Sequence, residues 1–280
     1  MPRMALLVTP NRHTGPFGTG AGRVAVESLR VAQEKEPYKS MPSLSGTVES
    51  NFVREVHLGE TVAPYRALTA RTGVLPLADD HILTPDEVDD HDGLSRWWAD
   101  VESAWEEGRK PSETKPLLER FDYHQQISRQ LPLAPHRVVY SKAGTALAAA
   151  RLENSEAVID HNLYWTATDS PEEGRYLVAI LNSATLLRRV QPLQTKGLLG
   201  PRHFDKYVFH IPFSTYDPAN NKHGKLVDLA TQAEDLAAGL DLEGINSTKA
   251  RAKIRAALTA AGLTEQIEAA AEEILPRITP

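Results

Sequence analysis

Proline and glycine divide the first 90 residues into short apolar runs, and this division limits what the region can fold into. The runs "ALLV", "NFVREVHL" and "GVLPLA" are separated by segments rich in Pro, Gly, Ser and Thr. Proline and glycine are poorly tolerated inside long helices but suit turns. Residues 1–90 are therefore expected to form short strands and loops.

The apolar spacing changes after this region. Thr84 opens a helix-start signature, because a proline and two acids follow it. Apolar residues then recur at three- and four-residue steps: Leu94, Trp97, Trp98, Val101 and Trp105. Such a stripe usually marks a buried helix face, with base stacking as the alternative. A second helix is predicted over "KPLLERFDYHQQISRQL", so residues 91–134 are interpreted as a helical pair.

Residues 135–221 are interpreted as one core. The runs "HRVVYSKAGTALAAARL" and "AVIDHNLYWTATD" are β-branched and aromatic, which favours a small mixed or antiparallel sheet. A helix is predicted next, with Ser170 as its N-cap and Arg188 and Arg189 in its last turn. After a loop, "KYVFHIPF" is predicted to be a strand broken by Pro212.

The remaining residues, 222–280, are rich in Ala and Leu, and predict three helices at 222–238, about 246–261 and 264–275. The predicted fold class is therefore α/β of the α+β type. It has a small mixed β-rich core, flanking helices and a C-terminal helical segment.

Composition excludes several classes of function. The chain has a net charge of -6 and no cysteine, so bulk attraction to nucleic acid, disulfides and thiolate chemistry are excluded. No apolar run is long enough for a signal peptide or a membrane span, and a cytoplasmic protein without membrane association is expected. A catalytic Gly-x-Ser-x-Gly or zinc-binding His-Glu-x-x-His motif is absent from the sequence, so no metal or catalytic residue is assigned.

A glycine-rich segment, "GPFGTGAGR" from Gly15 to Arg23, is a weak candidate for binding phosphate. It lacks the Gly-Lys-Ser/Thr ending of a P-loop, and a long turn separates it from the preceding apolar run. A flexible loop is the favoured interpretation, and no cofactor is assigned to this chain.

The stronger candidate is a basic loop within "LLRRVQPLQTKGLLGPRHFDKYVF". This segment contains several basic residues and a single acidic one, Asp205. Its two glycines would permit a partner to approach the backbone closely. Upstream cations and a tyrosine on the predicted strands extend the set, with a solvated sheet edge as the alternative. The candidate DNA-binding residues are Tyr140, Lys142, Arg151, Lys196, Arg202, His203, Lys206 and Tyr207.

The stretch from "YLVAILNSATLLRRV" to "RHFDKYVFHIPF" resembles the C-terminal target-recognition region of bacterial DNA adenine-N6 methyltransferases. These are type IIG-like enzymes of restriction-modification and phage-defence systems, with type I specificity subunits as more distant relatives. The similarity rests on Ala179 to Ser183, the glycine-rich basic loop and His210 to Pro212. It covers roughly residues 135–240 well, and "HLGETVAPYR" and "GLSRWWADVESAWE" more loosely.

The resemblance implies a module that reads a sequence of double-stranded DNA for a methyltransferase catalytic subunit or domain. It does not imply methylation by this chain, because the family's Asn-Pro-Pro-aromatic motif is absent. S-adenosylmethionine is therefore expected in a catalytic partner. A separately encoded subunit is slightly favoured over a fragment of a longer enzyme, and a protein-binding adaptor that keeps the recognition fold is the alternative, which the net charge favours.

Overall fold

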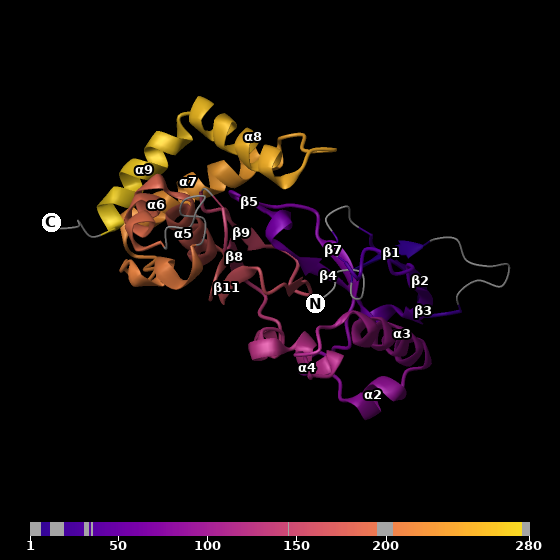
Figure 1. The fold of residues 1–280 in the computed structure, drawn as a ribbon. Helices are drawn as coiled ribbons and strands as arrows, with labels where there is room; N and C mark the ends of the chain where they lie inside the picture. Colours follow the sequence, from indigo (N-terminus) through magenta and orange to yellow (C-terminus); the bar gives the residue numbers. More distant parts are fainter. Residues whose placement is uncertain are drawn as a thin grey trace. The chain divides into compact units, whose positions relative to one another are not determined.

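The computed structural model describes residues 7–11, 20–30, 34, 36–144, 146–194 and 204–275. The chain divides into two compact units. Unit 1 consists of Met1–Val56, Ala70–Leu133 and Glu156–Ile159, and unit 2 of His57–Thr69, Ala134–Ser155 and Asp160–Pro280. Strands and helices are both abundant, so the fold is α+β, as predicted (Figure 1).

A six-stranded sheet with the order β10-β4-β7-β1-β2-β3 forms the centre of unit 1. The strands are β1 (Leu7–Asn11), β2 (Arg23–Ser28), β3 (Ser45–Glu49), β4 (Val53–His57), β7 (Arg71–Val74) and β10 (Val158–Ile159). Short strands in residues 1–90 were predicted from the turn residues. The register of β2 on β3 is antiparallel and pairs Val24 with Val48.

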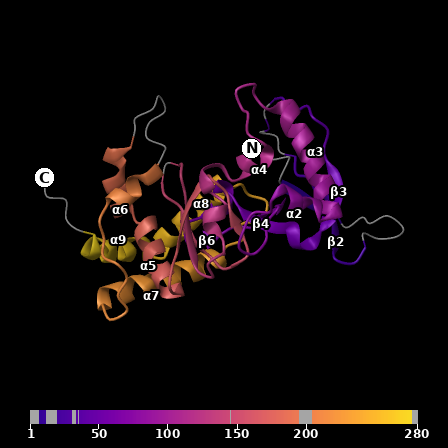
Figure 2. The ribbon, with the colours of Figure 1, turned by 90° about the horizontal axis from the view of Figure 1, so that it is seen from below.

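Two helices of unit 1 replace the single one expected after Thr84: α2 (Pro85–Asp89) and α3 (Asp92–Gly108). Thr84 caps α2 as predicted. The interruption arises because the carboxylate of Glu49 accepts the amides of Gly93 and Leu94, at 3.0 and 2.9 Å, and so begins a new helix. Figure 2 shows α3 lying along β3.

The tryptophan stripe of α3 is buried, which confirms core packing over base stacking. Leu94 and Val101 are fully buried, and the three tryptophans are at most 7% exposed. The Cβ position built on Gly46 of β3 lies 3.2 Å from the ring of Trp97, so this strand approaches the indole closely.

The second helix predicted in residues 91–134 is wrong over most of its length. Only α4 (Leu117–Phe121) forms, followed by 3-10 turns at Tyr123–Gln125 and Ser128–Gln130. The cause is local: His124 and Gln125 have positive φ, and the Asp122 carboxylate accepts the amides of Ile127 and Ser128.

Unit 2 contains the antiparallel sheet predicted for the core, with the order β11-β8-β9. Its strands are β8 (Arg137–Ser141), β9 (Ala149–Leu152) and β11 (Leu163–Ala167). The hairpin β5 (Val62–Ala63) and β6 (Arg66–Ala67) joins this unit, and the amide of Tyr65 donates to the carbonyl of Ala149 at 2.9 Å. The "HLGETVAPYR" segment therefore folds with residues 134–155.

The long helix predicted after Ser170 is two helices, α5 (Pro171–Asn182) and α6 (Ala184–Val190). Ser170 caps α5 as expected. The break occurs because Ser183 leaves helical geometry, and its hydroxyl accepts the amide of Leu186 at 3.1 Å.

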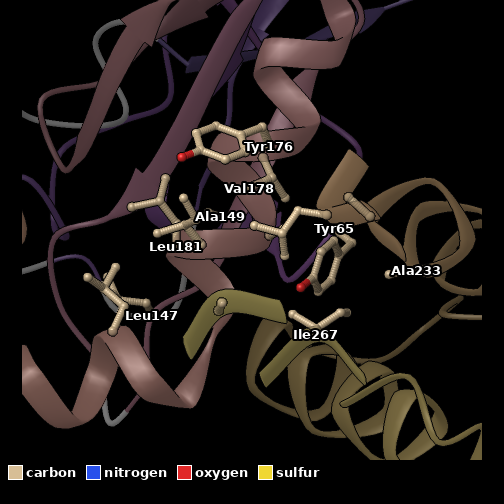
Figure 3. Close-up of a cluster of buried hydrophobic side chains, with 14 of the residues drawn as sticks. Tyr65, Leu147, Ala149, Tyr176, Val178, Leu181, Ala233 and Ile267 are labelled. Atoms are coloured by element: carbon tan, nitrogen blue, oxygen red, sulfur yellow. The ribbon is translucent and has the colours of Figure 1, made fainter. Parts of the chain in front are cut away.

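The three C-terminal helices are confirmed as α7 (Asn221–Ala238), α8 (Ser247–Ala260) and α9 (Leu263–Ile274). In Figures 1 and 2, α7 and α9 lie beside α5. Figure 3 shows side chains from separate segments meeting in the core of this unit, among them Tyr65, Tyr176 and Ile267. Across the described ranges, no helix is both long and apolar enough to span a bilayer.

The strand predicted over "KYVFHIPF" is wrong. Residues Asp205–His210 form a 3-10 helix, η6, and two fully buried apolar side chains at its start and middle belong to the core of unit 2. They are Phe204 and Val208, which are 1% and 2% exposed. The amide of Tyr207 donates to the carbonyl of Phe204 at 3.1 Å, and that of Ile211 to the carbonyl of Val208 at 3.3 Å, so hydrogen bonds between residues three apart take the place of strand pairing. The chain is extended again from Ile211.

Candidate nucleic-acid interface

The predicted basic loop is bounded by two buried residues of unit 2. Gln194 is 6% exposed, and its amide donates to the carbonyl of Gln191 at 3.2 Å. Phe204 is 1% exposed, and its amide donates to the carbonyl of Lys142 at 2.8 Å. Of the candidate residues, Lys196, Arg202 and His203 lie outside the described residues. Phe204, at the C-terminal boundary of the basic loop, is therefore hydrogen-bonded to Lys142, which is another candidate residue.

Lys142 follows β8 and belongs to the turn between β8 and β9, which we call the β8–β9 loop (residues 142–148). Its ammonium lies 4.5 Å from the centroid of the Tyr164 ring. Tyr164 on β11 pairs in register with Tyr140 on β8, and the two rings stack with centroids 5.3 Å apart. The side chains of Tyr140 and Lys142 share one strand face, because residues two apart in a strand point the same way. The result is a layered arrangement of Tyr140, Tyr164 and a cation.

Main-chain contacts hold the β8–β9 loop at several points. The amide of Ser141 donates to the carbonyl of Ala148, and the amide of Lys142 to that of Asn162, both at 3.2 Å. Gly144 has φ +154°, and a Cβ there would lie 3.3 Å from the carbonyl oxygen of Ala146. Glycine suits this position because an L side chain would be strained.

Tyr140 and Arg151 are engaged within unit 2. Tyr140 is 4% exposed, which leaves its ring no open face for a nucleobase. Arg151 makes a bidentate ion pair with Glu234 of α7, at 2.7 and 2.8 Å, and Arg175 of α5 donates to the same carboxylate at 3.0 Å. Hydrogen bonding to Glu234 raises the pKa of Arg151. This network ties β9 to α5 and α7.

The last two candidates lie on η6. Tyr207 is half-buried against the core of unit 2, and its ring meets His210 edge-on with centroids 6.1 Å apart. The backbone of Lys206 belongs to the same 3-10 helix, and its side chain lies outside the described part. Both residues come shortly after Phe204 in the sequence. Phe204 is the residue that is hydrogen-bonded to the β8–β9 loop at Lys142.

The exposed Ser214 and the buried His223 form a pair that has the composition of a hydrolytic dyad. Nε2 of His223 lies 3.0 Å from the Ser214 hydroxyl, while Nδ1 accepts the amide of Asp217 at 2.9 Å. Because Nδ1 accepts, the proton of the neutral ring is on Nε2 and is donated to Ser214. His223 therefore cannot take the serine proton as a general base, and the pair is structural.

The remaining motifs yield no site where the structure describes them. No group of three or more His, Asp or Glu side chains in the described ranges is arranged to hold a metal ion. In the "DDHDG" cluster, His91 packs edge-on against Phe52, with centroids 4.7 Å apart. Residues 15–19 of the glycine-rich segment lie outside the described residues. Arg23 begins strand β2 rather than the helix a nucleotide fold would need.

The sequence analysis missed three residues of unit 2: Tyr164, Arg251 and Arg255. Tyr164 and Arg255 contact the β8–β9 loop, and Arg251 lies one helical turn from Arg255. Tyr164 could have been identified because it alternates in period with the apolar residues of β11. The arginines occur on a predicted helix without acids, but its alanines drew attention to packing alone. No protein-family model matches this sequence, and a search of the curated proteins finds no significant similarity.

Proposed function

We propose that this chain reads DNA sequence as the specificity subunit or domain of an adenine-N6 methyltransferase in a restriction-modification or phage-defence system. A catalytic subunit or domain supplies S-adenosylmethionine chemistry. The proposal rests on the resemblance of the core segment to target-recognition regions and on the charge distribution around its basic loop.

One observation carries the proposal: the hydrogen bond from the Phe204 amide to the Lys142 carbonyl, at 2.8 Å. Lys142 and the basic loop are far apart in the sequence, and both were selected for positive charge. The hydrogen bond brings the end of that loop onto the β8–β9 loop. Phe204, which follows the basic loop in the sequence, is thus held beside Lys142, and phosphate neutralisation by cations of both segments is the proposed use.

The proposal assigns the candidate residues three different roles. Residues assigned to phosphate contacts are Lys142, Lys196, Arg202 and Lys206, and those assigned to the neighbourhood of the bases are His203 and Tyr207. Tyr140 and Arg151 are assigned a supporting role, because Tyr164 and Glu234 already engage them.

The test is a double substitution, Lys196→Ala with Arg202→Ala, measured by duplex binding over a salt series. Affinity is expected to fall for all sequences alike, and the slope of log K against log salt to flatten by about 0.9 for each phosphate that the variant no longer neutralises. The matched control is Arg96→Ala with Lys110→Ala, which removes the same charge from exposed positions of unit 1. An unchanged slope in the first variant contradicts the assignment.

The second candidate function is a protein-binding adaptor that keeps the recognition fold, favoured by the net charge of -6. The two functions differ in one competition experiment. If duplex DNA fails to displace a bound protein partner, and the chain binds no duplex at moderate salt, the adaptor function replaces the DNA-reading one.

A further inference from the structure

Helix α8 carries positive charge without compensation. Between Ser247 and Ala260 it has no acidic residue and four basic ones: Lys249, Arg251, Lys253 and Arg255. Arg251 and Arg255 are one turn apart, and residues four apart in a helix are neighbours on its surface. Two guanidinium groups therefore share one face.

Main-chain carbonyl oxygens hold both guanidinium groups in unit 2. Arg251 donates from Nε to the carbonyl of Val62 at 2.9 Å, and from a terminal nitrogen to the carbonyl of Gly59. Arg255 donates to the carbonyl of Leu147 at 2.8 Å. Leu147 belongs to the β8–β9 loop, so Arg255 is attached to the loop that contains Lys142.

No carboxylate pairs with either arginine among the residues that the structure describes. Burial lowers the pKa of both, and the charge of Arg251 further lowers the pKa of Arg255. Another arginine pair of unit 2 differs in this respect, because Arg151 and Arg175 share the carboxylate of Glu234. Two like charges held side by side without an anion are unfavourable unless an anionic ligand joins them.

Donors remain available on both side chains. Arg251 uses two of its five N–H groups and Arg255 one in these hydrogen bonds. Neither residue has a nitrogen that is buried without a partner in the described structure, and both side chains are partly buried. The carbonyl contacts thus fix the guanidinium planes and leave further N–H groups that are neither used by these carbonyls nor buried without a partner.

We propose that Arg251 and Arg255 form a binding site for a phosphate of the DNA backbone, beside the β8–β9 loop. The inference rests on the proposed function and extends it to a contact outside the basic loop. Guanidinium groups suit this task because their N–H groups match the oxygens of a phosphate in pairs. Such a contact adds affinity and fixes register but reads no base.

The test compares Arg251→Gln and Arg255→Gln with the wild-type chain, using a duplex of mixed sequence over a salt series. Because the two arginines share one phosphate, loss of either is expected to flatten the slope of log K against log salt by at most about 0.9, and to weaken binding by up to about tenfold near 0.1 M salt. Lys249→Gln is the control, since Lys249 is exposed on the same helix. Unchanged slopes in both arginine variants, or an equal change in the lysine control, would overturn the proposal.

A second measurement on the wild-type chain covers the case in which a variant fails to fold. The Nε–H resonances of Arg251 and Arg255 are expected to shift on addition of duplex, while inorganic phosphate at equal ionic strength shifts them only weakly. Saturation by inorganic phosphate without a response to duplex would assign the site to a free anion and overturn the DNA assignment. Duplex binding with silent resonances would refute this site alone, whereas a wild type that binds no duplex refutes the proposed function.

Discussion

The carboxylate of Glu268 on α9 accepts both the amide and the hydroxyl of Thr185 at the start of α6, each at 2.8 Å. It also accepts the amide of Ala184. An acid from one helix therefore caps the amino terminus of another, where free N–H groups and the helix dipole favour negative charge. The helix that precedes the basic loop is fixed to the C-terminal segment by this contact.

Glu268→Gln is expected to lower the free energy of unfolding by about 1–3 kcal/mol, because a neutral amide replaces one charged acceptor and points N–H groups at donors. Chemical denaturation measures the change. Glu265→Gln is the matched control, since Glu265 is exposed on the same helix. Equal stability of the two variants would contradict the capping role.

Gly93→Ala is expected to destabilise unit 1 by about 1–3 kcal/mol. A Cβ at this position would lie 2.6 Å from the carbonyl oxygen of Thr47 and 2.8 Å from the carboxylate of Glu49. Gly224→Ala in α7 meets nothing within 4 Å and should stabilise the chain by about 0.5–1 kcal/mol, since alanine favours a helix interior. Thermal unfolding of both variants should therefore show shifts of opposite sign.

The contribution of Glu49 to stability should depend on pH. Burial alone would raise the pKa of Glu49, but the amides of Gly93 and Leu94, together with Arg23, outweigh it and lower the pKa. A lowered folded-state pKa gives stability that is present above the unfolded value of about 4.3 and is lost as pH falls through the folded value. The stability difference between wild type and Glu49→Gln should shrink on acidification below that pH. Glu27→Gln, which removes an exposed acid from β2, is the matched control.

The ring of His223 is expected to carry its proton on Nε2, because Nδ1 accepts the amide of Asp217. Nitrogen chemical shifts of the histidine ring distinguish the two tautomers directly. A proton on Nδ1 would place two donors against each other and contradict the geometry. It would also reopen the interpretation of Ser214 and His223 as a catalytic pair.

Local signals in the sequence predicted much of the fold. The caps Thr84 and Ser170 begin helices because their side chains accept amides three residues later. The tryptophan stripe of α3 is buried because helical spacing places it on one face. The three C-terminal helices were predicted from Ala- and Leu-rich composition and from helix start and stop signals.

The helix predicted after Leu117 failed for local reasons, but other errors arose where distant residues decide the local structure. The break at Ser183 is reinforced by Glu268, 84 positions from Ala184, and no nearby signal reports that contact. In the candidate site, the sequence showed which residues are positively charged, but not which groups their side chains bind. Arg151 is held by Glu234, 83 residues later, and Arg255 by the carbonyl of Leu147.

Selection from randomised duplexes tests the central claim most directly. The chain, alone and with any methyltransferase that co-purifies with it, is incubated with the pool across a salt series, and the bound duplexes are sequenced. A DNA-reading function predicts enrichment of one short motif, with affinity that falls as salt rises. No enrichment in either state, with no binding at moderate salt, would contradict that function and assign the basic loop to ordinary surface.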